Sequence, residues 1–595
     1  MKIASYISSS ADNPRDIACA MAKSMCLHST HEVKVFPLAG GALSLVRTSE
    51  RFSTVPLLRK SASGNLLIVS GVPLDLCGSL DERLDKIVSG RSDVAAKELT
   101  RLDGAFAAIF WDAVEKQMTV VTDALGLQPL YIARTRNGLL LATELKAFPA
   151  SGLVETRMNP VGWGAFVGLG YALGNHTQLD GVHRMPPATV MRLDPATGAE
   201  DHEVYWRWPQ LCEQMVMEDV DTGAIIDVLR TELNAYAQHN KGCTILLSGG
   251  FDSRLALALM HMEGWNPEAL ILGHQDELFG ADAMLATSVV KRLGLSYRVV
   301  KTPRDFYRTS SYLDYLVMNE VTTPSLYLFI AQVLKNVNPS MEVVWDGTPP
   351  GYGLVPAFLP PGGFEVFLED SFQPRDAFIW KMADLTFGNE RADELFEAVS
   401  SALQRETSKY PDNETGVTMF EVYNRMRNRT TPNALSVYTN HAMPYMLGVS
   451  RPFWNLVGQI PYSVSKAFEL YFTLYRKHFQ QLAEVPFLSG GQLWCDRSSG
   501  LRGMIANGIY CGAKSKFTRL SQKAYRRYVR GSRRYWMDSQ FPGKTIERLN
   551  LDHPDLNADG IRAQDSNNRL PFYWQMWQWI LSGEMTTRNT DSFFR

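Results

Sequence analysis

The segment Ser248-Gly249-Gly250-Phe251-Asp252-Ser253 most constrains what this chain can fold into. It follows the apolar run 243–247 and precedes the apolar-rich stretch 254–260, which predicts a buried strand that passes through a glycine turn into a helix. Glycines let backbone N–H groups approach an anion, and a helix N-terminus adds the positive end of its dipole. The Gly-Lys-Ser/Thr ending of a Walker loop is absent. The segment therefore predicts a phosphate-binding turn of another kind.

The pattern Ser-Gly-Gly-x-Asp-Ser resembles the pyrophosphate loop of enzymes that split ATP into AMP and pyrophosphate. This resemblance implies that ATP and Mg²⁺ bind at the turn, with Asp252 as both a metal ligand and a catalytic residue. The loop residues that it assigns to ATP are Ser248, Gly249, Gly250, Asp252 and Ser253. The alternative interpretation is an ordinary strand-to-helix turn, which would require one glycine and no aspartate.

The composition is that of an ordinary globular protein. The chain has 595 residues, of which 45% are hydrophobic and 21% charged, and its formal net charge is -2. This length predicts two or more domains, and the small net charge gives no general support for a nucleic-acid or membrane partner. The chain start lacks the unbroken apolar segment of a signal peptide, so we expect a cytoplasmic location. The seven cysteines form no zinc spacing, which favours reduced thiols.

Short apolar runs separated by Gly, Asp and Pro turns dominate residues 1 to about 210. The predicted strands are 65–70, 105–111, 118–122 and 138–142. This pattern predicts packed antiparallel sheets.

Three phrases in this part, at 102–112, 123–131 and 143–147, resemble in the same order the glutaminase domain of asparagine synthetases of the glutamine-hydrolysing class B. The resemblance implies an Ntn-hydrolase-like, or glutaminase-like, sandwich over residues 1–210. Glutaminases of this class use an N-terminal Cys whose own amine is the base. Here Lys2 holds that position, and Cys19 and Cys26 are internal. We therefore expect a domain that does not hydrolyse glutamine.

From about residue 225 the pattern changes to alternating helices and strands. The predicted strands are 244–247, 269–272, 297–300 and 342–345, and the predicted helices are 253–263, 281–293 and 325–336. This alternation favours a parallel sheet flanked by helices, with the binding crevice beyond the carboxyl ends of the strands. The complete prediction is an α/β protein, with a pyrophosphate-loop ATPase domain, asparagine synthetase-like, over residues 220–595.

A second predicted strand end carries Asp346-Gly347-Thr348, with Gly351 three residues further on. Aligned on Gly347, which the resemblance also assigns to ATP binding, asparagine synthetases have Glu where this chain has Thr348 and a Mg²⁺-binding Asp where it has Gly351. Two readings of Asp346 remain open. It replaces the missing Asp as a Mg²⁺ ligand, or it caps the turn that Gly347 begins.

The residue after that glycine helps to choose among the family's branches. Asparagine synthetases carry Glu there and β-lactam synthetases carry Tyr, whereas a third branch, the lasso peptide cyclases, often lacks the glutaminase Cys. Resemblance to the cyclases implies adenylation of an Asp or Glu side chain of a precursor peptide, which its N-terminal amine then attacks to close a macrolactam. The implied partners are the precursor peptide and a leader peptidase or leader-binding protein of the same antibiotic biosynthesis pathway. A small-molecule amide ligase and a non-catalytic scaffold are the alternatives.

Two further segments have competing interpretations. Residues 497–537 contain many Lys and Arg and no acidic residue. The family has a catalytic Lys in this region, so Lys514 and Lys516 are the candidates, against a solvated basic helix or a nucleic-acid surface. The segment 168–174 imitates a dinucleotide fingerprint, but its glycine spacing is one residue too long, and we interpret it as a packed turn.

Overall fold

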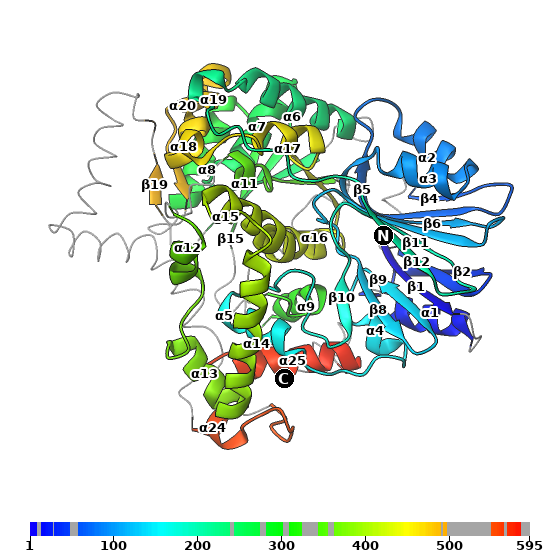
Figure 1. The fold of residues 1–595 in the computed structure, drawn as a ribbon. Helices are drawn as coiled ribbons and strands as arrows, with labels where there is room; N and C mark the ends of the chain where they lie inside the picture. Colours follow the sequence, from blue (N-terminus) through cyan, green and yellow to red (C-terminus); the bar gives the residue numbers. More distant parts are fainter. Residues whose placement is uncertain are drawn as a thin grey trace.

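The computed structural model describes residues 1–8, 13–27, 29–47, 57–237, 243–273, 281–301, 309–323, 343–354, 362–489, 492–494, 496, 549–563 and 568–584. Within these residues the chain builds two antiparallel sheets first and a parallel sheet afterwards (Figure 1). The α/β fold class predicted from the sequence is confirmed.

Two six-stranded sheets form the first half of the structure. One has the order β10-β8-β9-β1-β3-β2 and the other β12-β11-β7-β6-β5-β4, and all their pairs are antiparallel. The strands are β1 (Lys2–Ser8), β2 (Glu32–Leu38), β3 (Gly41–Arg47), β4 (Leu58–Lys60), β5 (Leu66–Leu74), β6 (Asp103–Asp112), β7 (Gln117–Thr122), β8 (Tyr131–Thr135), β9 (Gly138–Ala142), β10 (Val182–Arg184), β11 (Thr189–Leu193) and β12 (Glu200–Val204). The four strands predicted here are confirmed as β5, β6, β7 and β9.

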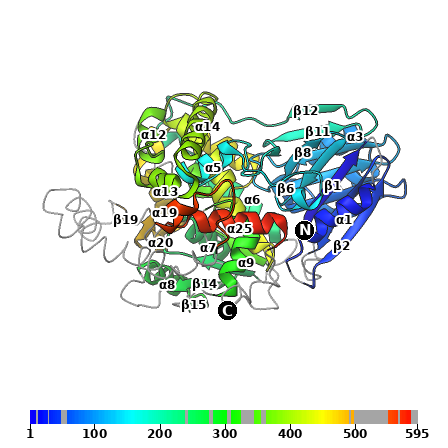
Figure 2. The ribbon, with the colours of Figure 1, turned by 90° about the horizontal axis from the view of Figure 1, so that it is seen from below.

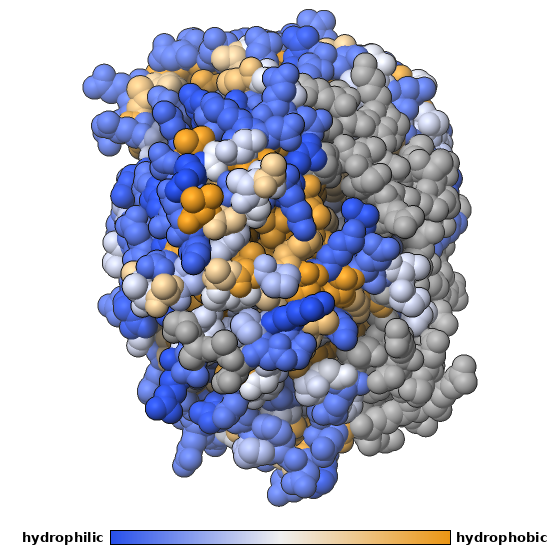
Figure 3. All heavy atoms as spheres, turned by 90° about the vertical axis from the view of Figure 1, so that its right-hand side faces the viewer, coloured by the Kyte–Doolittle hydropathy of each residue, from blue (hydrophilic) through white to orange (hydrophobic). Residues whose placement is uncertain are grey.

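Alternating side chains on these strands build two different cores. Ile3, Ile68 and Ile109 belong to an apolar cluster that draws residues from both sheets and so lies between them. Their neighbours Ala4 and Leu67 belong to a larger cluster shared with the helices that cover the outer faces. Those helices are α1 (Pro14–Ser24) on one sheet and α2 (Leu80–Ser89) and α3 (Ser92–Leu99) on the other. Figure 3 views this sandwich from its outer end, where apolar residues gather in the middle of the face.

The second half is organised around a five-stranded parallel sheet of order β15-β14-β13-β16-β17. Its strands are β13 (Cys243–Leu247), β14 (Glu268–Gly273), β15 (Tyr297–Lys301), β16 (Val343–Asp346) and β17 (Met443–Met446), and the helices between them include α7 (Asp252–Met262) and α8 (Ala281–Leu293). The four strands predicted here, and the helices over 253–263 and 281–293, are confirmed. Glu342 and the predicted helix over 325–336 lie outside the described residues.

Helices make up most of the remaining described chain, and several join the two halves. Their bounds are α4 (Ala147–Ala150), α5 (Pro160–Gly168), η2 (Met217–Asp219), α6 (Thr222–Ala237), α9 (Ser310–Asn319), α11 (Pro350–Leu354), α12 (Phe364–Ser371), α13 (Phe378–Phe387), α14 (Asn389–Thr407), α15 (Glu414–Phe420), the π-helix η5 (Glu421–Thr430), α16 (Thr431–Tyr438), α17 (Arg451–Val457), α18 (Tyr462–Ser465), η6 (Lys466–Phe468), α19 (Glu469–His478), α20 (Gln480–Ala483), α24 (Ala558–Arg562) and α25 (Leu570–Ser582), with a small hairpin of β18 (Phe487–Ser489) and β19 (Gln492–Trp494).

Close helix packing ties the halves together. A Cβ atom on Gly164 of α5 would lie 2.3 Å from the carbonyl oxygen of Leu395, so glycine lets α5 approach α14 closely. Near the chain end, α25 contacts α4, and Phe572 of α25 stacks on Tyr312 of α9. Figure 2 shows α25 beside α9. The predicted boundary between residues 210 and 220 stays a prediction.

An ion pair between the halves anchors α17 to the first sheets. Arg451 Nε lies 2.8 Å from Asp103 Oδ1, and the Arg451 backbone N–H donates to the same oxygen over 2.8 Å. Arg451 Nη1 also donates to the Thr100 carbonyl at 2.6 Å. The Asp103 side chain is 6% exposed, so its charge depends on this partner.

We predict that Arg451→Met lowers the free energy of unfolding by about 3–5 kcal/mol, because it leaves Asp103 buried without its guanidinium. The measurement is denaturant unfolding followed by near-UV circular dichroism. Arg134→Met is the matched control: its ion pair with Glu200 is 56% exposed on the Arg134 side, and its loss should cost at most about 1 kcal/mol. Equal losses of stability in the two variants would contradict the conclusion that the buried Asp103 depends on Arg451.

Candidate functional site

The predicted phosphate-binding turn joins β13 to α7. The Ser248 backbone N–H donates to Ser253 Oγ at 3.1 Å, and the two hydroxyl oxygens are also 3.1 Å apart. The Gly250 N–H donates to Ser248 Oγ at 3.2 Å. The strand-turn-helix geometry predicted from the sequence is confirmed. In this conformation both hydroxyls help to shape the turn.

Two glycines allow close backbone approaches at this turn. A Cβ atom on Gly249 would lie 2.7 Å from the Asp282 carbonyl oxygen, at the start of α8. A Cβ atom on Gly347, which follows β16, would lie 2.2 Å from the Ser253 backbone nitrogen. The residue after β16 therefore lies directly against the first turn of α7, with no side chain between them.

Asp252, the first residue of α7, carries a buried carboxylate oxygen. Its Oδ1 has no hydrogen-bond partner, although the residue as a whole keeps some exposure. Burial raises the pKa of Asp252 to about 8; the negative charge of Asp346 adds to the rise, and the Gly351 backbone opposes it. An aspartate in this state is stabilised by a cation that offsets its charge.

Asp346, the last residue of β16, is engaged by its neighbours. Its Oδ1 accepts hydrogen bonds from the Thr348 backbone N–H at 2.8 Å and from Thr348 Oγ1 at 2.6 Å. Its Oδ2 accepts from the Tyr438 hydroxyl at the end of α16. Asp346 therefore caps the turn, as one of the two readings expects. It also lies close enough to Asp252 to raise that residue's pKa, and its role as a metal ligand stays a prediction.

Gly351 sits directly against the Asp252 carboxylate. A Cβ atom there would lie 2.4 Å from Asp252 Oδ1 and 2.7 Å from Oδ2. An aspartate at position 351, as in the asparagine synthetases, would therefore collide with Asp252 in this arrangement. The Asp252 carboxylate thus occupies space that is open only because residue 351 is a glycine.

The residues present fit Mg²⁺ bound together with a phosphorylated substrate. Among the described residues, no group of three or more His, Cys, Asp or Glu side chains is arranged to hold a metal. Mg²⁺ bound with phosphates needs only one or two protein carboxylates, and Asp252 offers a buried oxygen without a partner. Asp252 would hold the ion, with Asp346 nearby.

Lys514 and Lys516, the predicted catalytic lysines, lie outside the described residues, and so does most of the basic stretch 497–537. Their assignment stays a prediction.

Sequence reasoning missed three side chains that hold the turn in place. The Tyr471 hydroxyl donates to the Phe251 carbonyl, and Phe251 packs edge-on against that ring. Arg254, buried in α7, donates to the carbonyls of Val485 and Pro486 at 2.6 and 2.7 Å. Tyr438 binds Asp346 from a segment 92 residues away. No local pattern marks these residues, because each contact depends on tertiary packing.

Lys2, at the start of β1, is buried in a network of charges. Its Nζ lies 2.8 Å from Glu144 Oε1 and donates to the Met25 carbonyl at 2.8 Å. Glu144 also pairs with Lys146 at 2.6 Å, and Glu320 of the second half lies 3.5 Å from Lys146. The Lys2 ammonium group, paired with Glu144, thus occupies the position at which the glutaminases that this half resembles carry the Cys thiol.

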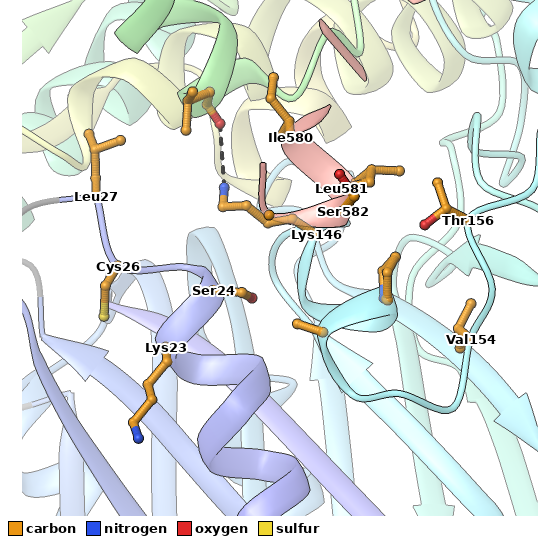
Figure 4. A pocket seen from close by; sticks show the side chains of 14 residues that line it. Lys23, Ser24, Cys26, Leu27, Lys146, Val154, Thr156, Ile580, Leu581 and Ser582 are labelled. Carbon is orange, nitrogen blue, oxygen red and sulfur yellow. Dashed lines mark hydrogen bonds between the residues drawn. The ribbon is translucent and has the colours of Figure 1, made fainter. Parts of the chain in front are cut away.

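A cavity of about 340 Å³ lies beside this network, lined by α1, α4 and α25 with Val317 of α9 (Figure 4). Lys146 reaches its wall and donates to the Val317 carbonyl at 3.4 Å. Because Lys146 is paired with Glu144 and Glu320, its charge on this wall is balanced. None of the residues of the β13–α7 turn lines this cavity.

Comparisons with known proteins agree with the description of the first half of the chain. Residues 87–206 match the family model of the glutamine amidotransferase domain. Amidase chry2 of Gibberella zeae is 24% identical over 303 residues, which cover 47% of this chain and 42% of that protein. A protein named as an asparagine synthetase (glutamine-hydrolyzing) of Mycobacterium bovis is 25% identical over 283 residues, which cover 44% of this chain and 41% of its own length. The chain thus spans less than half the length of these curated relatives.

Among solved structures, glutamine phosphoribosylpyrophosphate amidotransferase from B. subtilis, complexed with ADP and GMP, shares 12% identity and covers 70% of this chain and 95% of its own, with a TM-score of 0.26. With so low a TM-score, this likeness gives no further evidence about the fold. The sequence matches support a relationship to the asparagine synthetase-like glutamine amidotransferase superfamily. None of the helices in the described ranges combines the length and apolar character that a membrane crossing requires.

We predict that Asp252→Asn stabilises the protein in the absence of metal and nucleotide, increasingly so as pH rises. The folded state holds the Asp252 proton up to about pH 8, whereas the unfolded chain releases it near pH 3.8. Stability from this group is therefore lost as pH rises between those values, and Asn removes the loss. The measurement is the melting temperature of both proteins in EDTA from pH 5 to 8.

The control for this comparison is Asp227→Asn, because the Asp227 side chain is 72% exposed. Its melting temperature should follow the wild type at every pH. An Asp252→Asn protein that tracks the wild type in the same way would show that the Asp252 carboxylate is not desolvated.

Proposed function

We propose that this chain is an ATP-dependent amide-forming ligase that adenylates a carboxylate and releases pyrophosphate. The observation that carries the proposal is the Ser248–Ser253 turn with its buried, unpartnered Asp252 oxygen, placed at the carboxyl edge of a parallel sheet. Ligands of open α/β sheets bind at this edge. The superfamily relationship supports the same chemistry.

The turn's own groups account for the first half of the reaction. Attack of a carboxylate on the α-phosphorus of ATP, a substrate here, places growing negative charge on pyrophosphate. The N-terminus of α7 and the hydroxyls of Ser248 and Ser253 would stabilise that charge. Mg²⁺, when bound at Asp252, supplies further positive charge. An amine held against the activated acyl group gains from orientation, which lowers the barrier by roughly 7–11 kcal/mol.

We further propose that the substrate is a precursor peptide, as in lasso peptide cyclases. Thr348, in place of the Glu or Tyr of the other branches, and Lys2, in place of the glutaminase Cys, support this choice. The partners would be that peptide and the leader-processing proteins of its pathway, in the cytoplasm. A small-molecule amide ligase is the alternative, favoured by the match to a protein named as an asparagine synthetase.

We predict that the protein with Mg²⁺-ATP and its substrate peptide yields AMP and pyrophosphate. Asp252→Ala should slow release about a hundredfold or more, because a metal ion's charge contributes several kcal/mol to such a step. Ser248→Ala should slow it roughly fivefold to tenfold, as expected for a lost hydrogen bond. The assay is coupled detection of pyrophosphate with chromatography of the nucleotides, and exposed Asp227→Ala is the control. Formation of ADP and phosphate instead would disprove adenylation.

We predict that glutamine is not hydrolysed and does not raise product yield. Lys2 is held by Glu144 and the Met25 carbonyl, and it offers no nucleophilic thiol. Lys2→Cys should not restore hydrolysis, because Glu144, Lys146 and Glu320 keep their charges in place. The measurement is glutamate release against a no-enzyme blank, and a rate above that blank in the wild type would refute the prediction.

A further inference from the structure

The chain directly after α9 has a strained backbone. Glu320 and Val321 follow the helix with φ angles of 55° and 56°, in the left-handed region that most often holds glycine or asparagine at a helix end. The strain is greatest at Val321, because a β-branched side chain rarely adopts this conformation. Such a backbone persists only where the surrounding structure forces it. Contacts from outside α9 must therefore hold this segment.

The first half of the chain supplies those contacts. The Glu320 carboxylate is buried, and it accepts hydrogen bonds from the backbone N–H groups of Leu145 and Lys146 at 2.9 and 2.8 Å. The Val321 carbonyl accepts a hydrogen bond from the side-chain amide of Gln178 at 3.0 Å. Both residues of the left-handed segment are thus fixed by residues of the first half.

The buried charges at the start of β1 hold these donors in place. Lys2 pairs with Glu144 at 2.8 Å, and Glu144 pairs with Lys146 at 2.6 Å. Because Leu145 lies between the two paired residues, these ion pairs fix the backbone N–H groups that bind Glu320. Lys2 thus contributes to a contact between the halves, from the position at which glutaminases carry their Cys.

The same segment also supports the candidate site. Asn433 of α16 donates a hydrogen bond to Thr323 Oγ1 at 2.5 Å. The same helix ends at Tyr438, whose hydroxyl donates to Asp346 of the candidate site. The left-handed segment therefore lies between the first half and the helix that holds Asp346.

We propose that Glu320 is a positioning residue for the candidate site, and that the first half serves to hold it. Bound by two backbone N–H groups of the first half, Glu320 keeps the segment left-handed, so that Thr323 meets α16 and Tyr438 reaches Asp346. Without that hold, the segment relaxes to an ordinary backbone conformation and α16 loses its support. The effect on catalysis rests on the proposed function, but the link between Glu320 and α16 can be measured without turnover.

The first test follows hydrogen–deuterium exchange without ligand. Glu320→Gln keeps the side-chain length but has a single, uncharged acceptor oxygen. Amides of α16, relative to those of β6, should then exchange at least about tenfold faster, as expected for a lost hydrogen bond to a charged group. Glu98→Gln is the matched control, because Glu98 is similarly buried and pairs with Arg83 and Lys86 within the first half. Unchanged α16 exchange in Glu320→Gln, or an equal rise in the control, would overturn the proposal.

The second test separates positioning from a general loss of stability. Glycine adopts a left-handed backbone at little cost, so adding Val321→Gly to the Glu320→Gln protein should restore slow exchange in α16. Val321→Ala in the same background is the control, because it also shortens the buried side chain but keeps the unfavourable φ. It should restore little. A glycine variant that performs no better than the alanine variant would show that Glu320 does not act through the backbone conformation.

The third test connects the segment to the reaction. With Mg²⁺-ATP and the substrate peptide, Glu320→Gln should release pyrophosphate about tenfold more slowly, and Val321→Gly should recover most of that loss. A normal rate in a protein whose α16 exchanges faster would reject the role of Glu320 at the site. Failure of the ligase proposal is a different result: the wild type would release no pyrophosphate, while α16 would still respond to Glu320→Gln and recover with Val321→Gly.

Discussion

Two buried arginines fix the position of the π-helix η5, and the candidate site depends on that position. Arg427 of η5 donates to the carbonyls of Gly174 and Met185, and Arg184 of β10 donates to the carbonyls of Gly126 and Arg427. Burial lowers the pKa of Arg427 to about 9, so it stays charged at neutral pH and needs every one of these acceptors. The bonds hold η5 against the first sheets. Because η5 runs into α16, they also set where Tyr438 meets Asp346.

The sequence predicts those parts of the fold that local pattern determines. The apolar run of β13, bounded by the Ser-Gly-Gly turn, and the alternating strands β5 and β6 are recognisable from a few residues each. Strand β17 is not, because it has only four residues and one of them is Pro444. Asp252 is likewise evident from its motif. The hydrogen bond of Tyr438 to Asp346 is not, since it arises from packing between distant segments.

Asp252 carries a carboxylate oxygen that is buried without a hydrogen-bond partner. Burial raises the pKa of Asp252 to about 8, so the folded state favours the protonated carboxyl until a cation binds beside it. Sites that bind charged ligands commonly sacrifice stability in this way. A cation bound at Asp252 would displace that proton and offset the cost of burying the charge. Binding and folding stability would then be strongly linked.

The contacts of Gly347 and Gly351 bear on how such a protein can diversify. No side chain fits between Gly347 and Ser253, or between Gly351 and Asp252. Loops at a functional edge are usually where a family varies to acquire new specificities. Gly347 and Gly351 are sterically closed to substitution, so a mutational search for altered substrate preference would find its tolerated changes at other positions. Libraries aimed at the two strand ends would return mostly unfolded proteins.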